Sequence, residues 1–165
     1  MPTIFTHPAV ALALRVPRRL AVAAVILTIL PDADVAGLRL GIPYGSTFGH
    51  RGLTHSIVFA ALAALLATLL LRADRRAFAF LFVCAVSHGL LDAMTTGGRG
   101  IAFFSPFSNA RYFLPWRPIR VSPIGGIDLR VLASELRWVW LPAVVLAAIP
   151  RPSRKPPPGT ARTHP

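Results

Sequence analysis

Residues 52–71 read GLTHSIVFAALAALLATLLL, a polar start followed by the longest uninterrupted apolar stretch in the chain. About 20 apolar residues are enough for a helix to cross the hydrocarbon core of a bilayer. The sequence therefore predicts a membrane-spanning helix over residues 52–71.

Further apolar segments lie on both sides of this stretch. Residues 76–95 and 128–149 are also long enough to span, and a charged turn at 72–76 separates the first of them from 52–71. Residues 18–30 form a shorter predicted helix, which Pro31 ends because proline lacks an N–H and clashes with the preceding turn. Residues 8–15 form a short apolar helix ahead of it.

The remaining segments have the composition of loops. Residues 35–49 contain Gly and Pro, and residues 97–127 repeat Gly, Pro and aromatic residues, so neither segment is expected to form a regular helix. Asp128 is expected to cap the last helix, and Pro142 is expected to kink it.

The composition agrees with a membrane protein. The chain has 165 residues, of which 54% are hydrophobic and 15% charged, whereas soluble domains have about 45–50% apolar and about 25% charged residues. The alternative is a very apolar soluble bundle. We expect an all-α fold, a small integral-membrane helical bundle over 1–149, followed by a disordered basic, Pro-rich tail over 150–165.

The net charge indicates which classes of partner the protein binds, and the cysteine content shows whether a disulfide can form. The net charge is +12, which suits anionic lipid or an anionic substrate. Because no basic helix is free of apolar residues, we expect no nucleic-acid partner. The single cysteine, Cys84, lies in an apolar helix and is expected to be buried, which excludes a disulfide. Asp74 is expected to be a solvated turn charge and Glu135 a surface or Arg-paired residue.

The acidic and imidazole residues gather at one end of the predicted bundle. Successive helices run antiparallel, so the end of helix 18–30, the start of helix 52–71 and the far end of helix 76–95 lie on the same side. This connectivity predicts a metal site built from seven residues: His7, Asp32, Asp34, His50, His55, His88 and Asp92. A carboxylate at membrane depth is costly unless it is paired or bound to metal.

Local spacing supports this site. His88 and Asp92 are four residues apart, on one face of their helix. Carboxylates beside imidazoles suit zinc, with manganese or iron as alternatives. The number of ions stays open. In the string His50–Ser56, Arg51 can hold a phosphate or carboxylate oxygen in its planar fork.

The sequence resembles a known family at these motifs. The strings LPDAD at 30–34, HRGLTHS at 50–56 and SHGLLD at 87–92, followed by TTGG at 95–98, are similar to the signature of the YdjM-like, LexA-binding, inner-membrane-associated metal-dependent hydrolases. The resemblance covers about residues 4–125. It implies an integral membrane protein with a divalent-metal hydrolase site. A more distant similarity, in ligand types and helical setting only, extends to the zinc-dependent phospholipase C and P1 nuclease group.

The resemblance and metal chemistry together suggest hydrolysis of a phosphate ester in a lipid or another anionic substrate. Asp32 and Asp34 would act as ligand or general base, and Arg51 would steady the anionic group. Arg99 and Arg111 lie in the loop that follows Asp92 and are expected to attract the substrate. The alternative for this loop is an interfacial lid without substrate contact.

Other functions and the orientation stay open. The alternatives are a non-catalytic metal-binding membrane protein, such as a sensor or transporter, and an interaction protein that acts through its basic tail. Basic residues number ten on the side opposite the site and eight on the site side, so the positive-inside rule favours a multi-pass inner-membrane protein whose site faces outward. The oligomeric state is not predicted.

Overall fold

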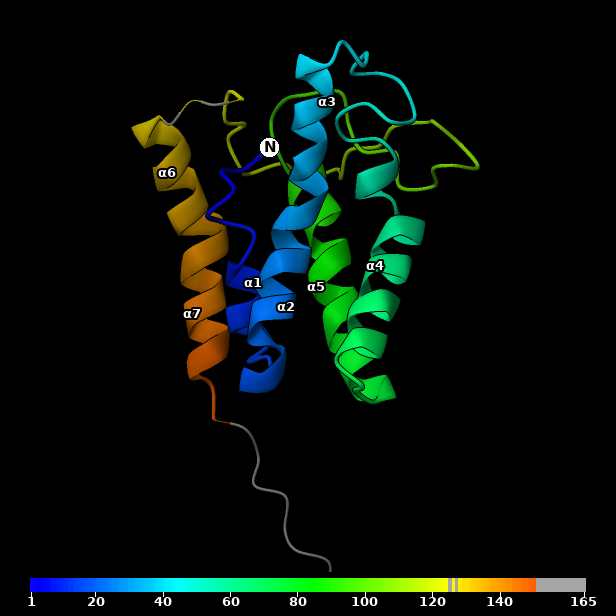
Figure 1. The fold of residues 1–165 in the computed structure, drawn as a ribbon. Helices are drawn as coiled ribbons and strands as arrows, with labels where there is room; N and C mark the ends of the chain where they lie inside the picture. The colour runs from blue at the N-terminus through cyan, green and yellow to red at the C-terminus, as the bar shows by residue number, and fades with distance from the viewer. Residues whose placement is uncertain (125, 127, 151–165) are drawn as a thin grey trace, which may run out of the picture.

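The structure is a computed structural model that describes residues 1–124, 126 and 128–150. Within these residues it is all-helical, with two isolated β-bridges and no named strand. The helices run up and down as a small bundle (Figure 1). The predicted fold class is confirmed. The predicted disordered tail lies outside the described residues, except for Pro150.

The first membrane-length segment combines three consecutive helices. After the short α1 (Ala9–Ala13), the chain forms α2 (Arg18–Ile29), a 3-10 turn η1 (Leu30–Asp34) and α3 (Val35–Arg39). The α-helix α2 ends at Ile29, just before Pro31, which agrees with the prediction, but residues 35–39, predicted as loop, form a further helix. Pro31 lies in the first turn of η1, where its missing N–H costs little, so the helical path continues to Arg39.

The second segment is shorter than predicted. A 3-10 turn η2 (Leu53–His55) precedes α4 (Ile57–Leu70), whose 14 residues fall below the length of a full span. The helix starts late because Ser56 is extended and its side chain accepts a hydrogen bond from the Phe59 N–H. The expected span over 52–71 is therefore wrong in length.

The later helices agree with the sequence. Helix α5 (Arg75–Ala93) is capped by Asp74, whose side chain accepts from the Ala77 N–H. Asp128 caps α6 (Leu129–Glu135) as predicted. Before Pro142, where a kink was expected, the chain forms a π-helical turn, η3 (Leu136–Trp140). Pro142 itself lies in the first turn of the next helix, α7 (Leu141–Ala148).

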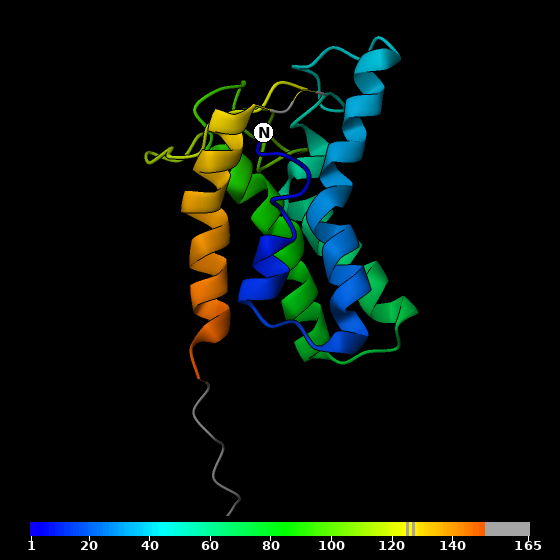
Figure 2. The ribbon, with the colours of Figure 1, turned by 90° about the vertical axis from the view of Figure 1, so that its left-hand side faces the viewer.

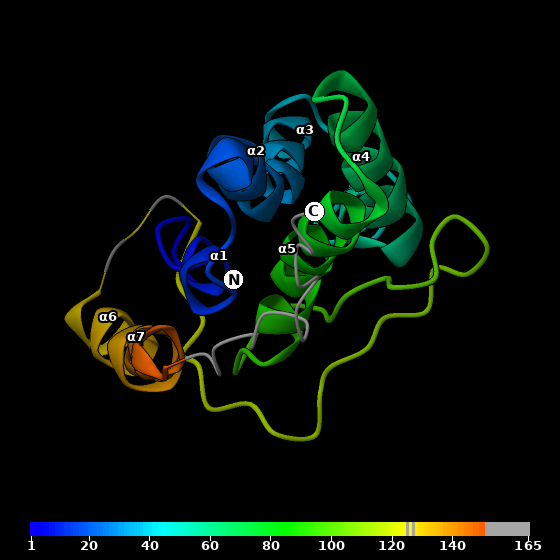
Figure 3. The ribbon, with the colours of Figure 1, turned by 90° about the horizontal axis from the view of Figure 1, so that it is seen from below.

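Three helical segments are long and apolar enough to cross a membrane: Arg18–Arg39, Arg75–Ala93 and Leu129–Ala148. Helix α5 packs between α2 and α4, while α1 contacts α7. Seen from below, α1 lies between the α6–α7 helix and the group formed by α2, α4 and α5 (Figure 3).

Small residues make this packing close. Ala24, Ala60, Ala64, Ala77 and Cys84 are buried in one apolar core between α2, α4 and α5. Small side chains let helix backbones approach in a membrane, where lipid gives helices no hydrophobic reason to associate. Cys84 is free and buried, as predicted.

Large apolar side chains point outward. On α4 the exposed side chains include Leu62, Leu66, Leu69 and Leu70. An apolar outer surface over a small-residue core is the arrangement expected for a protein surrounded by lipid.

The polar segments gather at one end of the bundle. The N-terminus, α3 and the loop after α5 lie at the top of Figure 1, while the α4–α5 turn and the end of α7 lie at the bottom. The loop is held by main-chain hydrogen bonds from Ala102 to Arg51, from Leu114 to Ala93 and from Ser122 to Met1.

Candidate metal centre

The helical segments Arg18–Arg39 and Arg75–Ala93 supply the carboxylates and one histidine. Asp32 lies in η1, and its residue is 6% exposed. His88 and Asp92 lie on the inner face of α5 and are completely buried. The spacing of four residues places them one turn apart, as predicted.

A tight loop carries the two histidines of the string His50–Ser56, His50 and His55. Arg51 has a positive φ of 64°. A Cβ on Gly49 would lie 2.2 Å from the Pro43 carbonyl oxygen, and one on Gly52 would lie 2.3 Å from the Thr47 carbonyl oxygen. Only glycine therefore fits at these two close backbone approaches.

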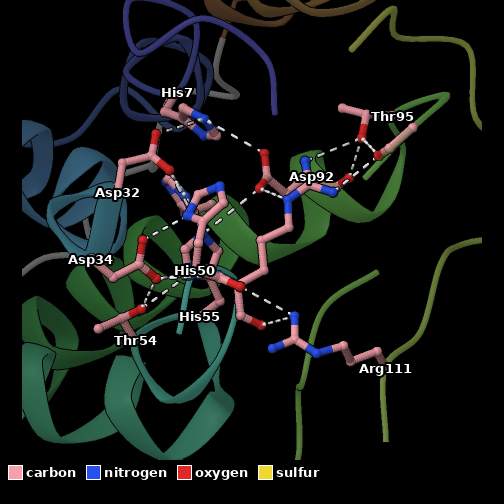
Figure 4. Close-up of polar contacts among 12 residues, drawn as sticks. His7, Asp32, Asp34, His50, Thr54, His55, Asp92, Thr95 and Arg111 are labelled. Atoms are coloured by element: carbon pink, nitrogen blue, oxygen red, sulfur yellow. Dashed lines mark hydrogen bonds and ion pairs between the residues drawn. The ribbon is translucent and has the colours of Figure 1, made fainter. Parts of the chain in front are cut away.

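Asp32, His55, His88 and Asp92 form what we call the inner cluster, drawn in part in Figure 4. Each offers one ligand atom, and these atoms all lie within 4.8 Å of one another. His55 Nε2 is 3.0 Å from His88 Nε2 and 3.7 Å from both Asp32 Oδ1 and Asp92 Oδ2. This donor set can hold a metal ion.

The hydrogen bonds of the two imidazoles fix which nitrogen faces the cluster. His88 Nδ1 donates to the Thr28 carbonyl oxygen at 2.8 Å, and His55 Nδ1 is 3.2 Å from the Asp34 carboxylate. Carbonyl and carboxylate oxygens only accept, so both Nδ1 atoms carry the hydrogen. The two Nε2 atoms therefore face each other across the cluster, an arrangement that a shared cation, either a proton or a metal ion, stabilises.

The carboxylates of the inner cluster also indicate that the cluster favours a bound cation. Both oxygens of Asp32 and both of Asp92 are buried, and none accepts a well-directed hydrogen bond within the described residues. Buried unpaired carboxylate oxygens are costly. The Asp32 and Asp34 carboxylates oppose the effect of burial on His55 and raise the pKa of this imidazole to about 9. The centre favours positive charge, from a proton or a metal.

His7 lies at the edge of the inner cluster. Its ring stacks on His88 with 3.9 Å between centroids, and its Nε2 is 3.9 Å from Asp32 and 4.0 Å from Asp92. Burial, and secondly the nearby His88, lower the pKa of His7 to about 3. The ring is therefore neutral at physiological pH and has a free lone pair.

Asp34 and His50 lie beside His55, outside the inner cluster. Asp34 accepts hydrogen bonds from His50 Nδ1 at 2.6 Å, from the Thr54 hydroxyl at 2.5 Å and from the Arg51 N–H at 3.2 Å. The set of Asp34, His50 and His55 also has metal-binding geometry. Because donors already occupy Asp34, the inner cluster is the better metal candidate.

The three expected substrate-binding arginines lie in different surroundings. Arg51 is buried, with Nε 2.9 Å from Asp92 Oδ2 and one guanidinium N–H donated to the Gly97 carbonyl. Arg111 donates to the carbonyls of His50 and Arg51 and so braces the loop. Arg99 is exposed, over the Tyr44 ring. Their roles toward a substrate stay predictions.

The roles of three residues differ from those that the sequence predicted, or were not predicted. Thr28 contributes only its backbone carbonyl, which leaves no signal in the sequence. Asp74 is a helix cap beyond its predicted role as a turn charge. Glu135 was predicted to be a surface or Arg-paired residue, and within the described residues it is neither. It is 2% exposed and accepts hydrogen bonds from the Thr3 N–H and from the hydroxyls of Thr3 and Thr6.

Comparison with known proteins agrees with this picture. The chain is 43% identical, over 164 aligned positions, to the inner membrane protein YbcI of Escherichia coli (strain K12), covering 88% of this chain and 95% of that protein. No solved structure matches the chain, and the distant similarity to phospholipase C and P1 nuclease stays a prediction. A family match described as YdjM inner membrane protein covers residues 2–151. The chain therefore belongs to the YdjM family of inner membrane proteins.

Proposed function

We propose that this protein is a membrane-bound metal-dependent hydrolase that cleaves phosphate esters. The carrying observation is the inner cluster, in which two imidazole Nε2 atoms 3.0 Å apart and the carboxylates of Asp32 and Asp92 face one buried point. The name of the relative states its location and not its activity, so the reaction is inferred from the chemistry of the donor set.

Zinc is the ion that we propose. Zinc accepts imidazole and carboxylate ligands with Zn–N bonds of about 2.0–2.1 Å, and two Nε2 atoms 3.0 Å apart suit ligation of one such ion. A divalent ion at this position activates water and polarises a phosphoryl oxygen.

The protein residues then divide the work. His55, His88, Asp32 and Asp92 hold the ion, with His7 available as a further nitrogen ligand. Asp34 accepts from His55 and orients it, which is the usual role of a carboxylate behind a metal-bound histidine. Arg51 neutralises Asp92 and fixes its carboxylate. Asp32 is also placed to accept a proton from water because it borders an open cavity.

The first experiment measures metal and turnover together. We expect the detergent-purified protein to contain stoichiometric zinc and to hydrolyse phosphate esters, and we expect the His88→Ala/Asp92→Ala double variant to lose both. Asp74→Asn is the control, because Asp74 is an aspartate on the same helix at the far end of the bundle. Equal metal in the double variant and the wild type contradicts the site. Stoichiometric metal without turnover on any ester would instead show a non-catalytic metal-binding protein.

The orientation is a separate part of the proposal. We propose that the metal centre faces the outer side of the inner membrane, with Arg72, Arg75 and Arg76 in the cytoplasm. A reporter that is active only outside the cytoplasm, inserted after Phe107, should be active, and the same reporter inserted after Ala73 should not. The opposite pattern contradicts this orientation.

A further inference from the structure

An open cavity of about 370 Å³ lies at the site end of the bundle and reaches Asp32 of the metal centre. Residues 1–5 form one wall, Val35 and Arg39 of α3 form another, and residues 122–124 with Gly126 form the third. Asp32 is the residue of the inner cluster that lines it. The cavity is therefore the route by which a molecule from outside meets the candidate ligands.

The position of the cavity indicates where its ligand comes from. Figure 2 shows the N-terminal segment between α6 and α3, and these helices belong to two of the candidate membrane spans. Because the cavity lies near the site-side ends of two candidate spans, we expect it to open toward the lipid headgroups. A membrane lipid would then enter it by lateral movement without leaving the bilayer.

The lining suits a molecule with an apolar chain and an anionic head. Ile4, Phe5 and Ile124 expose 42%, 68% and 50% of their surface beside the cavity. Arg39 is exposed on the rim and makes no ion pair among the described residues. Arginine binds phosphate through its planar fork. The lining thus combines an apolar wall with the guanidinium of Arg39 and the carboxylate of Asp32.

We propose that this cavity binds an anionic phospholipid, with its chains against Ile4, Phe5 and Ile124 and its phosphate between Arg39 and the metal centre at Asp32. This inference rests on the proposed function only for the cleavage that follows binding. In that cleavage a water oxygen bonds to phosphorus, the bond between phosphorus and the ester oxygen breaks, and the released alcohol takes a proton. The products are the alcohol and the hydroxyl-bearing phosphate.

The test reads lipid binding without requiring turnover. The full-length, metal-loaded protein is placed in bilayer discs with phosphatidylglycerol that carries a photoreactive group on one acyl chain, and the crosslinks are mapped by mass spectrometry. We expect crosslinks to concentrate at residues 4–5 and 124. Crosslinks spread evenly over the outward-facing helix surfaces overturn the proposal.

Two variant pairs sharpen this result. Val35→Trp fills the cavity and should abolish the crosslinks at residues 4–5, whereas Val22→Trp, on the exposed face of the same helical segment, should leave them unchanged. Arg39→Gln should reduce the preference for phosphatidylglycerol over zwitterionic phosphatidylcholine about fivefold, the effect of one surface cation on an anionic headgroup. Arg130→Gln, outside the cavity, should not.

The remaining measurements distinguish a lipid from a soluble phosphate as the ligand and check that the variants fold. If glycerol phosphate displaces the photoreactive lipid as well as phosphatidylglycerol does, the ligand is a soluble phosphate and the lipid proposal fails. All variants should keep wild-type metal content, and Ile124→Trp replaces Val35→Trp if the latter does not fold. Specific crosslinks without hydrolysis would refute the proposed reaction and leave the lipid site standing.

Discussion

Replacement of Glu135 tests whether the last membrane span holds His7 at the metal centre. The Glu135 carboxylate accepts hydrogen bonds from the Thr3 N–H at 2.5 Å and from the hydroxyls of Thr3 and Thr6, each at 2.7 Å. Thr6 directly precedes His7. Glu135→Ala removes every one of these acceptors and leaves the buried Thr3 N–H without a partner.

The expected cost follows from these bonds. A hydrogen bond to a charged group contributes about 1.5–3 kcal/mol, and loss of one member of a buried polar network costs about 3–5 kcal/mol. The N-terminal segment should then detach, and loss of its support for His7 should weaken zinc binding about 10- to 100-fold. Glu135→Gln should lose about 1–2 kcal/mol, because the amide oxygen can accept from Thr3 N–H while the amide nitrogen donates to the hydroxyls.

The assay combines thermal unfolding in detergent, zinc competition with a chelator and protease cleavage before residue 8. Asp128→Ala is the matched control, because it removes a cap at the start of the same helix, where Asp128 accepts from the Arg130 N–H, and costs about 1 kcal/mol. The reasoning is refuted if Glu135→Ala and Asp128→Ala show the same zinc affinity and the same protease sensitivity.

Three further predictions concern the metal centre and its loop. Asp34→Asn should lower zinc affinity about 10- to 100-fold and keep the stoichiometry, whereas Asp92→Asn should remove the ion; equal titration curves for the two variants contradict an orienting role for Asp34. Gly49→Ala should destabilise the protein by about 3 kcal/mol and displace the loop, because its Cβ meets the Pro43 carbonyl, while Gly41→Ala, with a φ of 78° and open space, should cost about 1 kcal/mol. Removal of zinc by a chelator should lower the melting temperature of the wild type and not that of the His88→Ala/Asp92→Ala variant.

The convergence of the site could be predicted because it depends on connectivity alone. Consecutive helices in a bundle run antiparallel, so residues at alternate helix ends meet on one side. Asp32, His55 and His88 come from different segments, and the structure brings them within ligand distance of one another. The spacing of four residues between His88 and Asp92 also predicted that these two residues share one face of their helix.

The helix limits could not be predicted in the same way. Proline ends a helix when it lies in the interior but is tolerated in the first turn of a new one, and the sequence around Pro31 does not distinguish these cases. Thr54 and Ser56 are both suitable N-cap residues, and only the hydrogen bond from the Phe59 N–H to the Ser56 hydroxyl shows that the helix starts at the second of them.

Burial of Glu135 was missed for a different reason. Its partners Thr3 and Thr6 are about 130 positions away in the chain, and no local pattern announces such a contact. Whether an acidic residue is buried depends on tertiary partners that satisfy it, so sequence alone favoured the surface.

The short α4 has a consequence for the surrounding membrane. Its 14 residues span about 21 Å at a rise of 1.5 Å per residue, whereas the hydrocarbon layer is about 30 Å thick. If α4 crosses the bilayer with its neighbours, we expect the lipids next to it to compress and the headgroups to approach its start at Ile57. The same hydrophobic mismatch should make the protein partition into thinner bilayers.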